Sequence, residues 1–285
     1  MKAIPRGAIR WINMISANAK KLSENEYISS DGVRRCRKCN EPTTWTGSAK
    51  IKEDGAIINC TFRRKCRCQK EQLAKASEEY LANQIQIAKI RAFKRFGLKY
   101  TKCDFTTDDR KNISLTEKVR SYINNFDKYY ANGQGLILCG NVGVGKTYAA
   151  AIIINEILKK KNLKTDQLYK CYITKLETIK RSILNKNYSD DQVFGVLNNQ
   201  DLLVIDDFGT QNDTNFVLEL MQNIIDARYN NCKPIIITTN VDFNNIQKYA
   251  DPKQRLAYER VRSRLCEMCK IIKCEGSDRR IYAQG

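Results

Sequence analysis

The chain has 285 residues, of which 12 are cysteine and none is histidine, and 50 Lys/Arg against 31 Asp/Glu give it a net charge of +19. Without histidine, catalytic triads and general bases that use imidazole are excluded, and any zinc must be bound by sulfur or carboxylate. No apolar run approaches the roughly 18 residues of a membrane helix, and polar residues interrupt the N-terminal segment too often for a signal peptide. We therefore expect a cytoplasmic protein with no membrane partner, whose cysteines are reduced or bind a metal.

Positive charge is concentrated in the N-terminal third of the chain. Residues 1–96 contain 21 Lys/Arg and 9 Asp/Glu, a net charge of +12, and residues 97–285 contain 29 and 22, a net charge of +7. This uneven excess predicts that a polyanion or an acidic protein binds the N-terminal part.

Two close pairs of cysteines, CRKC and CRC, lie 26 residues apart in a basic region that we delimit as residues 1–70. Four thiolates in two pairs suit tetrahedral Zn²⁺, and the surrounding arginines and lysines favour the thiolate form. The predicted zinc ligands are Cys36, Cys39, Cys66 and Cys68. Cys60 is a fifth cysteine in this region that could take the place of one of these ligands. The alternative to a zinc site is a basic tail whose cysteines are reduced and bind no metal.

The remaining cysteines are predicted to be small buried side chains rather than metal ligands. Cys266 and Cys269 have metal-like spacing, but they fall in a predicted helix among apolar neighbours. The full set with this interpretation is Cys103, Cys139, Cys171, Cys232, Cys266, Cys269 and Cys274.

Residues 71–96 contain neither glycine nor proline, and Leu73, Tyr80 and Ile87 recur at intervals of seven. This pattern predicts a long amphipathic helix. Gly97 follows its basic end and is predicted to terminate it. We assign residues 71–97 to a linker helix between the zinc module and a second domain, residues 98–285.

In that second domain, short apolar runs alternate with helical patterns. Nearly continuous apolar strands separated by helices predict an α/β fold, with a central parallel sheet flanked by helices on both faces. The predicted strands are 135–139, 171–174, 201–206 and 234–240. The predicted helices are 147–161, 176–184, 215–230 and 255–269.

The segment GNVGVGKT, residues 140–147, matches the phosphate-binding loop G-x-x-x-x-G-K-[ST]. It follows an apolar strand and opens a helix, so backbone N–H groups and the helix N-terminus would converge on the phosphates of ATP. Lys146 is predicted to reach the β- and γ-phosphates, and Thr147 to bind Mg²⁺. The predicted nucleotide-binding residues of this loop are Gly140, Asn141, Val142, Gly143, Val144, Gly145, Lys146, Thr147 and Tyr148.

Polar side chains end two further strands. LLVIDDF places Asp206 and Asp207 at the carboxyl end of a buried strand, where parallel sheets bind ligands. Asp206 is predicted to hold Mg²⁺, and Asp207 to orient the attacking water. Asn240 ends the strand PIIITTN and is predicted to sense the γ-phosphate and that water.

The motifs GLILCGNVGVGKT, LLVIDDFG, IIITTN, ERVRSRL and GSDRR occur in this order in residues 98–285. In this respect the chain resembles the AAA+ ATPases of the DnaC/DnaI-type replicative helicase loaders, a group that includes the IstB transposition ATPases. The resemblance implies that Arg264, with Arg260 as second candidate, reaches ATP bound by a neighbouring subunit. It also implies that Arg279 contacts phosphate within its own chain. Asp207 stands where most AAA+ members have glutamate, which predicts slow hydrolysis.

The resemblance implies an ATPase that loads a hexameric replicative DNA helicase onto single-stranded DNA and self-associates in its ATP-bound form. It also implies that the cysteine module docks on the helicase. Weak candidates for DNA contact are Lys180, Arg181 and Lys186. An IstB-like ATPase that regulates DNA transposition is one alternative, and a zinc-dependent nucleic-acid-binding protein with a degenerate ATPase site is another.

Overall fold

The computed structural model describes residues 3–5, 8–51, 54–108, 112–184, 189–209, 215–241, 255–276 and 278. The chain divides into two compact units, residues 1–82 and 83–285. Within the described residues, no helix combines the length and the apolar character needed to cross a bilayer.

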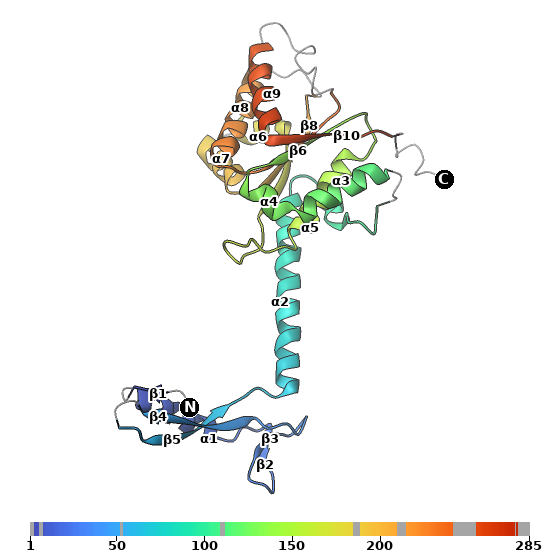
Figure 1. Ribbon diagram of the computed structural model, residues 1–285. Helices are drawn as coiled ribbons and strands as arrows, with labels where there is room; N and C mark the ends of the chain where they lie inside the picture. The colour runs from blue at the N-terminus through green and yellow to red at the C-terminus, as the bar shows by residue number, and fades with distance from the viewer. Residues whose placement is uncertain are drawn as a thin grey trace. The chain divides into compact units, whose positions relative to one another are not determined.

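The first unit contains two small sheets and a helix that packs on one of them (Figure 1). β4 (Thr44–Ile51) and β5 (Ile57–Arg63) form an antiparallel hairpin, and β1 (Ala3–Ile4) extends it by parallel pairing with β4. α1 (Ile9–Lys20) packs against β5. β2 (Glu26–Ile28) and β3 (Arg34–Cys36) form a second hairpin, which ends at the first cysteine of CRKC.

Few apolar side chains are buried in this unit. Among the apolar and cysteine side chains that the structure describes there, the buried ones outside the cysteine pairs are Ile51 and Cys60. Trp45 stacks on Phe62 across the hairpin with ring centroids 5.1 Å apart, yet it remains 51% exposed. The hairpin therefore contributes little core of its own.

α2 (Arg67–Phe93) begins inside the CRC pair and includes residues of both units. The predicted helix is confirmed, although it starts and ends earlier than expected, and Gly97 donates its N–H to the carbonyl of Phe93 at the C-terminus. The predicted apolar face is not buried, because Leu73, Tyr80 and Ile87 are 49%, 66% and 40% exposed. The 3₁₀ helix η2 (Leu98–Lys102) follows.

The second unit is built on a five-stranded parallel sheet with the order β10-β6-β9-β8-β7. In chain order this is fifth, first, fourth, third, second. The strands are β6 (Gly135–Cys139), β7 (Cys171–Lys175), β8 (Leu202–Phe208), β9 (Ile235–Thr239) and β10 (Cys269–Lys273). The predicted central parallel sheet is therefore confirmed. β10 was not predicted, and it follows the last helix without a turn.

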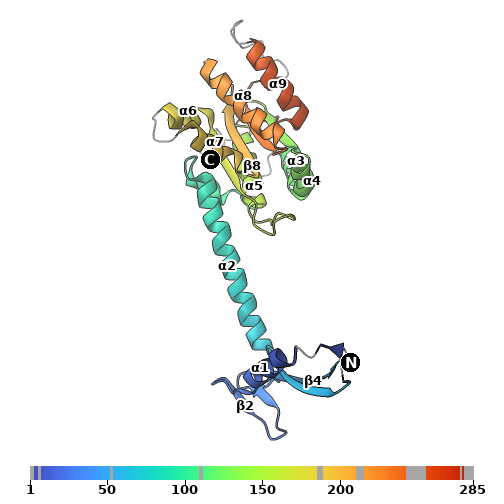
Figure 2. The same ribbon diagram turned by 90° about the vertical axis from the view of Figure 1, so that its left-hand side faces the viewer.

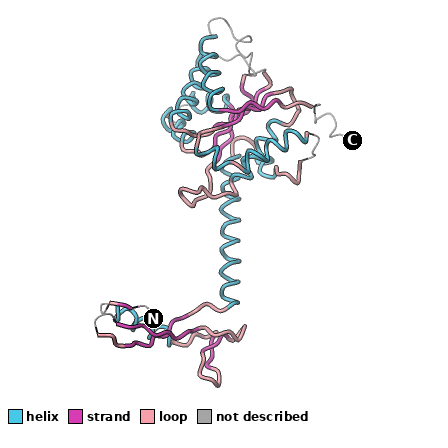
Figure 3. The backbone as a smooth tube through the Cα atoms, viewed as in Figure 1, coloured by secondary structure: helices cyan, strands magenta, loops and turns pink. Residues whose placement is uncertain are grey.

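Helices cover both faces of this sheet (Figure 3). One apolar cluster joins the sheet to α3, α4, α5 and the end of α2, and a second joins it to α6, α7, α8 and α9. The helices are α3 (Ile113–Asn124), α4 (Phe126–Ala131), α5 (Lys146–Ile157), α6 (Leu176–Leu184), α7 (Asp190–Asn198), α8 (Asn215–Asn230) and α9 (Arg255–Met268). Because β6 lies between β9 and β10, the loop that follows it opens at a switch point of the sheet, where α/β proteins bind ligands.

Candidate functional site

The predicted phosphate loop connects the carboxyl end of β6 to the N-terminus of α5. Gly145 precedes the helix with a φ of 96°, and Gly143 has a φ of 81°. These positive φ values favour glycine at both positions. A Cβ on Gly143 would lie 1.9 Å from Oδ1 of Asp278, so the Asp278 carboxylate lies directly against the loop. Asp278 belongs to the GSDRR segment, which thus reaches the loop.

Lys146 is buried although it carries a charge, and it folds back over the loop that it ends. Its Nζ donates to the carbonyls of Gly140 and Asn141 at 2.8 and 2.7 Å. Of the other loop side chains, Val144 is buried and Val142 is 54% exposed. The loop thus has the local arrangement that its sequence predicts, with the ammonium held beside the backbone that would bind phosphate.

Asp206 lies beside the phosphate loop, and two hydroxyls meet at one of its oxygens. Its Oδ1 accepts hydrogen bonds from Thr147 Oγ1 at 2.8 Å and from Thr238 Oγ1 at 2.6 Å. Burial raises the pKa of Asp206, the two hydroxyl bonds oppose that rise, and the charge of Asp207 adds to it. Thr147 and Asp206 therefore present adjacent oxygen donors of the kind that Mg²⁺ prefers, and the predicted pair fits this ion.

Asp207 has a φ of 58°, and the pairing of β8 with β9 is irregular between Ile205 and Phe208. Its backbone N–H donates to Thr238 Oγ1 at 3.0 Å. A single buried hydroxyl therefore links the two aspartates. The sequence pattern predicts the strand end that carries Thr238, but it contains no signal that marks this threonine itself.

The carboxylate of Asp207 is paired with Lys175, the last residue of β7. Burial lowers the pKa of Lys175, but the hydrogen bond to Asp207 and the charges of both aspartates outweigh it, so the pKa is raised. No local sequence pattern marks Lys175, because its position beside the aspartates depends on the register of two parallel strands.

Asn240 follows β9 and is half-buried. It lines a cavity of about 270 Å³ at the carboxyl ends of the central strands, together with Gly140 and Asn141 of the phosphate loop and Gly276 of the GSDRR segment. The predicted sensor amide and the phosphate loop therefore share one cavity.

Tyr148 follows the phosphate loop in the sequence, and its hydroxyl forms a 2.6 Å hydrogen bond with the hydroxyl of Thr107.

The predicted trans arginine lies on α9, which runs beside α8 (Figure 2). Arg264 Nε is 2.7 Å from Asp226 Oδ1, and its guanidinium lies 4.8 Å from the centre of the Tyr229 ring. The side chain remains 43% exposed. Its described contacts are thus with α8, and Arg260 one turn earlier is exposed. Arg279 lies outside the described residues.

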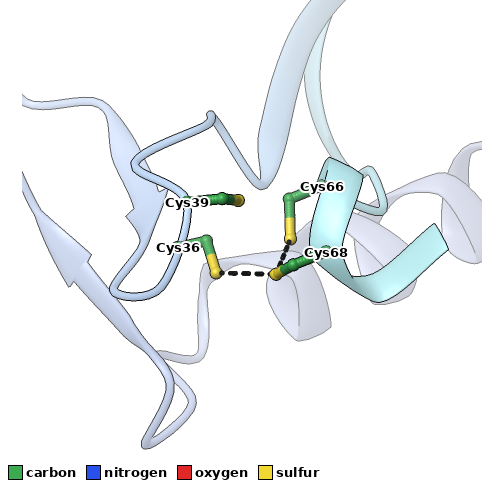
Figure 4. Close-up of side chains that lie close together, drawn as sticks. All are labelled: Cys36, Cys39, Cys66 and Cys68. Carbon is green, nitrogen blue, oxygen red and sulfur yellow. Dashed lines mark hydrogen bonds between the residues drawn. The ribbon is translucent and has the colours of Figure 1, made fainter. Parts of the chain in front are cut away.

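The four predicted zinc ligands come together in the first unit (Figure 4). All four sulfurs lie within 4.8 Å of one another, and Cys68 Sγ is 3.5 Å from Cys36 Sγ and 3.3 Å from Cys66 Sγ. A tetrahedral Zn²⁺ with Zn–S bonds of about 2.3 Å separates its sulfurs by roughly 3.8 Å, so the cluster fits one ion. Cys60 pairs with Gly47 in the β4–β5 hairpin and is outside this group.

The thiols of this cluster have unequal pKa values. Backbone N–H groups of the CRKC turn lower the pKa of Cys36 to about 6, whereas hydrogen bonds with neighbouring thiols raise that of Cys68 to about 12. These thiols would lose their protons when they bind a divalent cation.

Of the cysteines predicted to be buried side chains, Cys232 and Cys266 are exposed, and that prediction is wrong for both. Cys232 lies in the turn after α8, and Cys266 lies on the outer side of α9.

The glycine loop after β6, the aspartates that end β8 and the strand order define a P-loop nucleotide-binding protein with the AAA+ arrangement. Residues 66–284 match the family described as IstB-like ATP binding protein, and the chain belongs to this family. The replicative helicase loader DnaC of Escherichia coli (strain K12) is 27% identical over 202 residues, which cover 69% of this chain and 73% of DnaC. The replicative helicase loader DnaI of Bacillus subtilis (strain 168) is 21% identical over 285 residues, which cover 94% of this chain and 84% of DnaI.

Two solved structures share the fold. A crystal structure of DnaI superimposes with a TM-score of 0.53 and 20% identity, covering 65% of this chain and 94% of that one. A crystal structure of the DnaC helicase loader superimposes with a TM-score of 0.51 and 28% identity, covering 62% of this chain and 99% of that one. The predicted AAA+ fold and the predicted relationship to the DnaC/DnaI and IstB group are confirmed.

Proposed function

We propose that this protein is an ATP-dependent helicase loader that binds a hexameric replicative DNA helicase and single-stranded DNA in the cytoplasm. ATP binding would favour loading, and hydrolysis would favour release, at the initiation of replication. The main support is the combination of a phosphate loop whose Thr147 is hydrogen-bonded to Asp206 of β8 with a cysteine module that precedes it in the chain. An alignment with DnaI that covers 94% of this chain, the cysteine region included, adds to it.

Each residue of the nucleotide site has a proposed task. The phosphate loop and Lys146 would bind the triphosphate, and Thr147 and Asp206 would hold Mg²⁺, which when bound neutralises charge on the phosphates. Asp207 would orient the attacking water, with Asn240 as the sensor that contacts it. Aspartate has a shorter reach than glutamate, which agrees with slow turnover.

Arg264 is proposed to act on ATP bound by a second copy. Two features support this role: Arg264 lies on α9, and its side chain is 43% exposed although it is paired with Asp226 of α8. Self-association in the ATP-bound form would then bring a guanidinium to each γ-phosphate. Arg279 is proposed to contact the phosphate in its own chain, since its neighbour Asp278 lies against the phosphate loop.

The remaining parts of the chain are proposed to bind partners. Residues 1–70, with Zn²⁺ held by Cys36, Cys39, Cys66 and Cys68, would dock on the helicase. Residues 71–97 would connect this module to the ATPase domain, residues 98–285. Lys180 and Arg181 on α6 are candidates for contact with DNA phosphates, whereas Lys186 lies outside the described residues.

The second candidate function is that of an IstB-like ATPase that regulates DNA transposition, and the family description itself favours it. The two functions differ in the partner protein. A transposase would replace the helicase, and duplex DNA would replace the single strand.

A pull-down from the native host in the presence of a non-hydrolysable ATP analogue tests the proposal. The full-length chain is expected to retain a hexameric replicative helicase, and the Lys146→Ala variant, which cannot bind the triphosphate tightly, is expected to retain less. Loss of the helicase with Cys36→Ser would support docking through the cysteine module. Recovery of a transposase in place of the helicase would contradict the loader function and favour the alternative.

A further inference from the structure

One edge of the parallel sheet is formed by β10, and β6 is the only described strand that pairs with it. Directly after β10, Cys274 donates its N–H to the carbonyl of Cys139 on β6 at 2.7 Å. Successive residues of a strand direct their backbone N–H and C=O groups to opposite sides. The backbone groups of Ile271 and Lys273 therefore point away from the sheet, where they can pair with a further strand.

A cavity of about 150 Å³ lies beside this edge, between β10 and the helices α3 and α4. Its floor is apolar, because Tyr122, Leu136 and Ile272 are buried there. The Tyr122 and Tyr129 rings stack with centroids 5.0 Å apart, and the Tyr122 hydroxyl donates to the carbonyl of Gln134 at 3.0 Å. A cavity of this volume has room for one small apolar side chain from a strand bound at the edge.

The rim of this cavity is positively charged. It carries three exposed lysines, Lys118 of α3 and Lys270 and Lys273 of β10, and none of the described residues that line it is acidic. None of the ion pairs that the structure describes involves these lysines. An acidic ligand would therefore meet three ammonium groups around the open edge.

The charge and the backbone of this edge together select one kind of ligand. Lysines at a sheet edge oppose pairing with an identical edge, since two copies of β10 side by side would bring their lysines together. A nucleic acid would meet the same charge, but it has no strand backbone to pair with Ile271 and Lys273. Its bases would also lack a stacking surface, because Tyr122 is buried and stacked on Tyr129. An extended acidic peptide satisfies both the backbone and the charge.

We propose that the outer edge of β10 is a docking site for an extended acidic segment of a partner protein. The segment adds to the sheet as a further strand, and its backbone pairs with Ile271 and Lys273. Its carboxylates pair with the lysines of the rim, and one apolar side chain enters the cavity. No residue with a proposed task in ATP hydrolysis takes part, so this surface is a further function of the domain.

Fluorescence anisotropy of the full-length chain with a labelled peptide tests this site. The probe is a peptide of about six residues, the usual length of a strand, in which Glu alternates with Val. We expect this Glu–Val peptide to bind, whereas a Lys–Val peptide of the same length should not. N-methylation of the backbone amides removes N–H donors and leaves the charge of the Glu–Val peptide unchanged, so it should weaken binding at least about tenfold.

Charge reversal at the rim locates the binding site. The double variant Lys118→Glu/Lys270→Glu should weaken binding of the Glu–Val peptide at least about tenfold and should bind the Lys–Val peptide instead. That exchange of preference distinguishes a reversed site from a misfolded chain. The control Lys128→Glu/Lys164→Glu makes the same change of charge at two exposed positions outside the cavity, and it should change neither affinity.

No binding of the Glu–Val peptide at about 1 mM, or equal binding of its N-methylated form, would overturn the proposal. An unchanged affinity in the rim variant would overturn it too, because it would indicate general attraction to a basic chain. A single-stranded oligonucleotide that binds through the same lysines and displaces the peptide would instead assign the surface to nucleic acid. These measurements use neither helicase nor ATP, so their outcome is independent of the test of the loader function.

Discussion

The candidate sites of the two units are related to the core of their own unit in opposite ways. In residues 1–82, three of the five buried apolar or cysteine side chains that the structure describes belong to the cysteine cluster: Cys36, Cys66 and Cys68, beside Ile51 and Cys60. In residues 83–285, two apolar clusters cover the faces of the parallel sheet and include none of the groups that would bind Mg²⁺. The cysteine cluster is thus a large part of the core of its unit, whereas the nucleotide site is added to a unit that has its core already.

The two sites also differ in completeness. The cluster gathers all four sulfurs from one unit of one chain. In the nucleotide site, the phosphate loop, the two aspartates and Asn240 lie close together within one chain. Arg264 is not among these residues, because its described contacts are with α8. If the proposed functions are correct, one metal ion would complete the first unit, whereas the second unit would require an arginine from another copy of the chain for full activity.

Removal of the metal is expected to have the largest effect, and it should affect the first unit alone. Structural zinc sites contribute an apparent binding free energy of about 10–16 kcal/mol, far more than the small apolar core of this unit can replace. Chelation, or Cys36→Ser, should abolish the dispersed amide NMR signals of residues 1–82 and leave ATP affinity unchanged. The purified reduced protein should contain about one equivalent of zinc. Less than about half an equivalent of zinc, or a first unit that stays folded without metal, would contradict the claim that the metal site stabilises this unit.

Loss of Arg264 is expected to have the next largest effect. An arginine supplied by a neighbouring subunit contributes roughly 10³–10⁵-fold to phosphoryl transfer. Arg264→Ala should therefore reduce partner-stimulated hydrolysis by about 10³-fold and leave the affinity for ATP nearly unchanged.

Mixing two inactive variants provides the control for that experiment. Arg264→Ala chains retain an intact phosphate loop, and Lys146→Ala chains retain the arginine. If the arginine acts between chains, the mixture should recover part of the activity that each variant lacks. A mixture as inactive as its components, or equal loss of ATP binding in Arg264→Ala, would show that Arg264 acts within its own chain or supports the fold.

Local sequence patterns were enough to predict the residues of the nucleotide site. The contacts between segments far apart in the sequence could be identified only from the structure. The phosphate loop could be predicted because the glycines, Lys146 and Thr147 form a contiguous segment between an apolar run and a helix. Lys175 could not, because a position beside Asp206 depends on the pairing register of β7 and β8. Thr238 links the two aspartates for the same non-local reason.

The fold was predictable to a similar extent. The four buried strands β6 to β9 were predicted from their continuous apolar residues. β10 was missed because its apolar part is only Ile271 and Ile272 between two lysines, and because the strand follows α9 with no glycine or proline between them. The strands of the first unit were missed for two reasons: β1, β2 and β3 have only two or three residues each, and the longer β4 and β5 are largely polar and bury few side chains. The exposed stripe of Leu73, Tyr80 and Ile87 shows that helical spacing alone does not establish burial.

The smallest expected effect is a change in the stability of the second unit on substitution of Asp206. Bound zinc is expected to stabilise the first unit, whereas the ionised Asp206 carboxylate is expected to destabilise the metal-free second unit. Burial raises the pKa of this carboxyl in the folded protein above its usual value. Between the usual and the raised pKa, the folded state binds more protons than the unfolded state, so stability falls as pH rises through this range. At a pH above both values, the ionised carboxylate therefore lowers the stability of the metal-free second unit. Asp206→Asn keeps an oxygen that can accept from Thr147 and Thr238, and it removes the charge.

This substitution should stabilise the nucleotide-free second unit on the order of 1 kcal/mol at pH 7, or roughly 2–4 °C in Tm, and should remove the Mg²⁺ dependence of ATP binding. The gain should shrink as the pH is lowered through the raised pKa, because the native carboxyl then becomes neutral as well. Thermal unfolding of both proteins across this pH range measures the difference. A lower Tm for Asp206→Asn at neutral pH would mean that the ion pair with Lys175 outweighs the cost of burial. The nucleotide site would then stabilise its unit as the cysteine cluster stabilises the other.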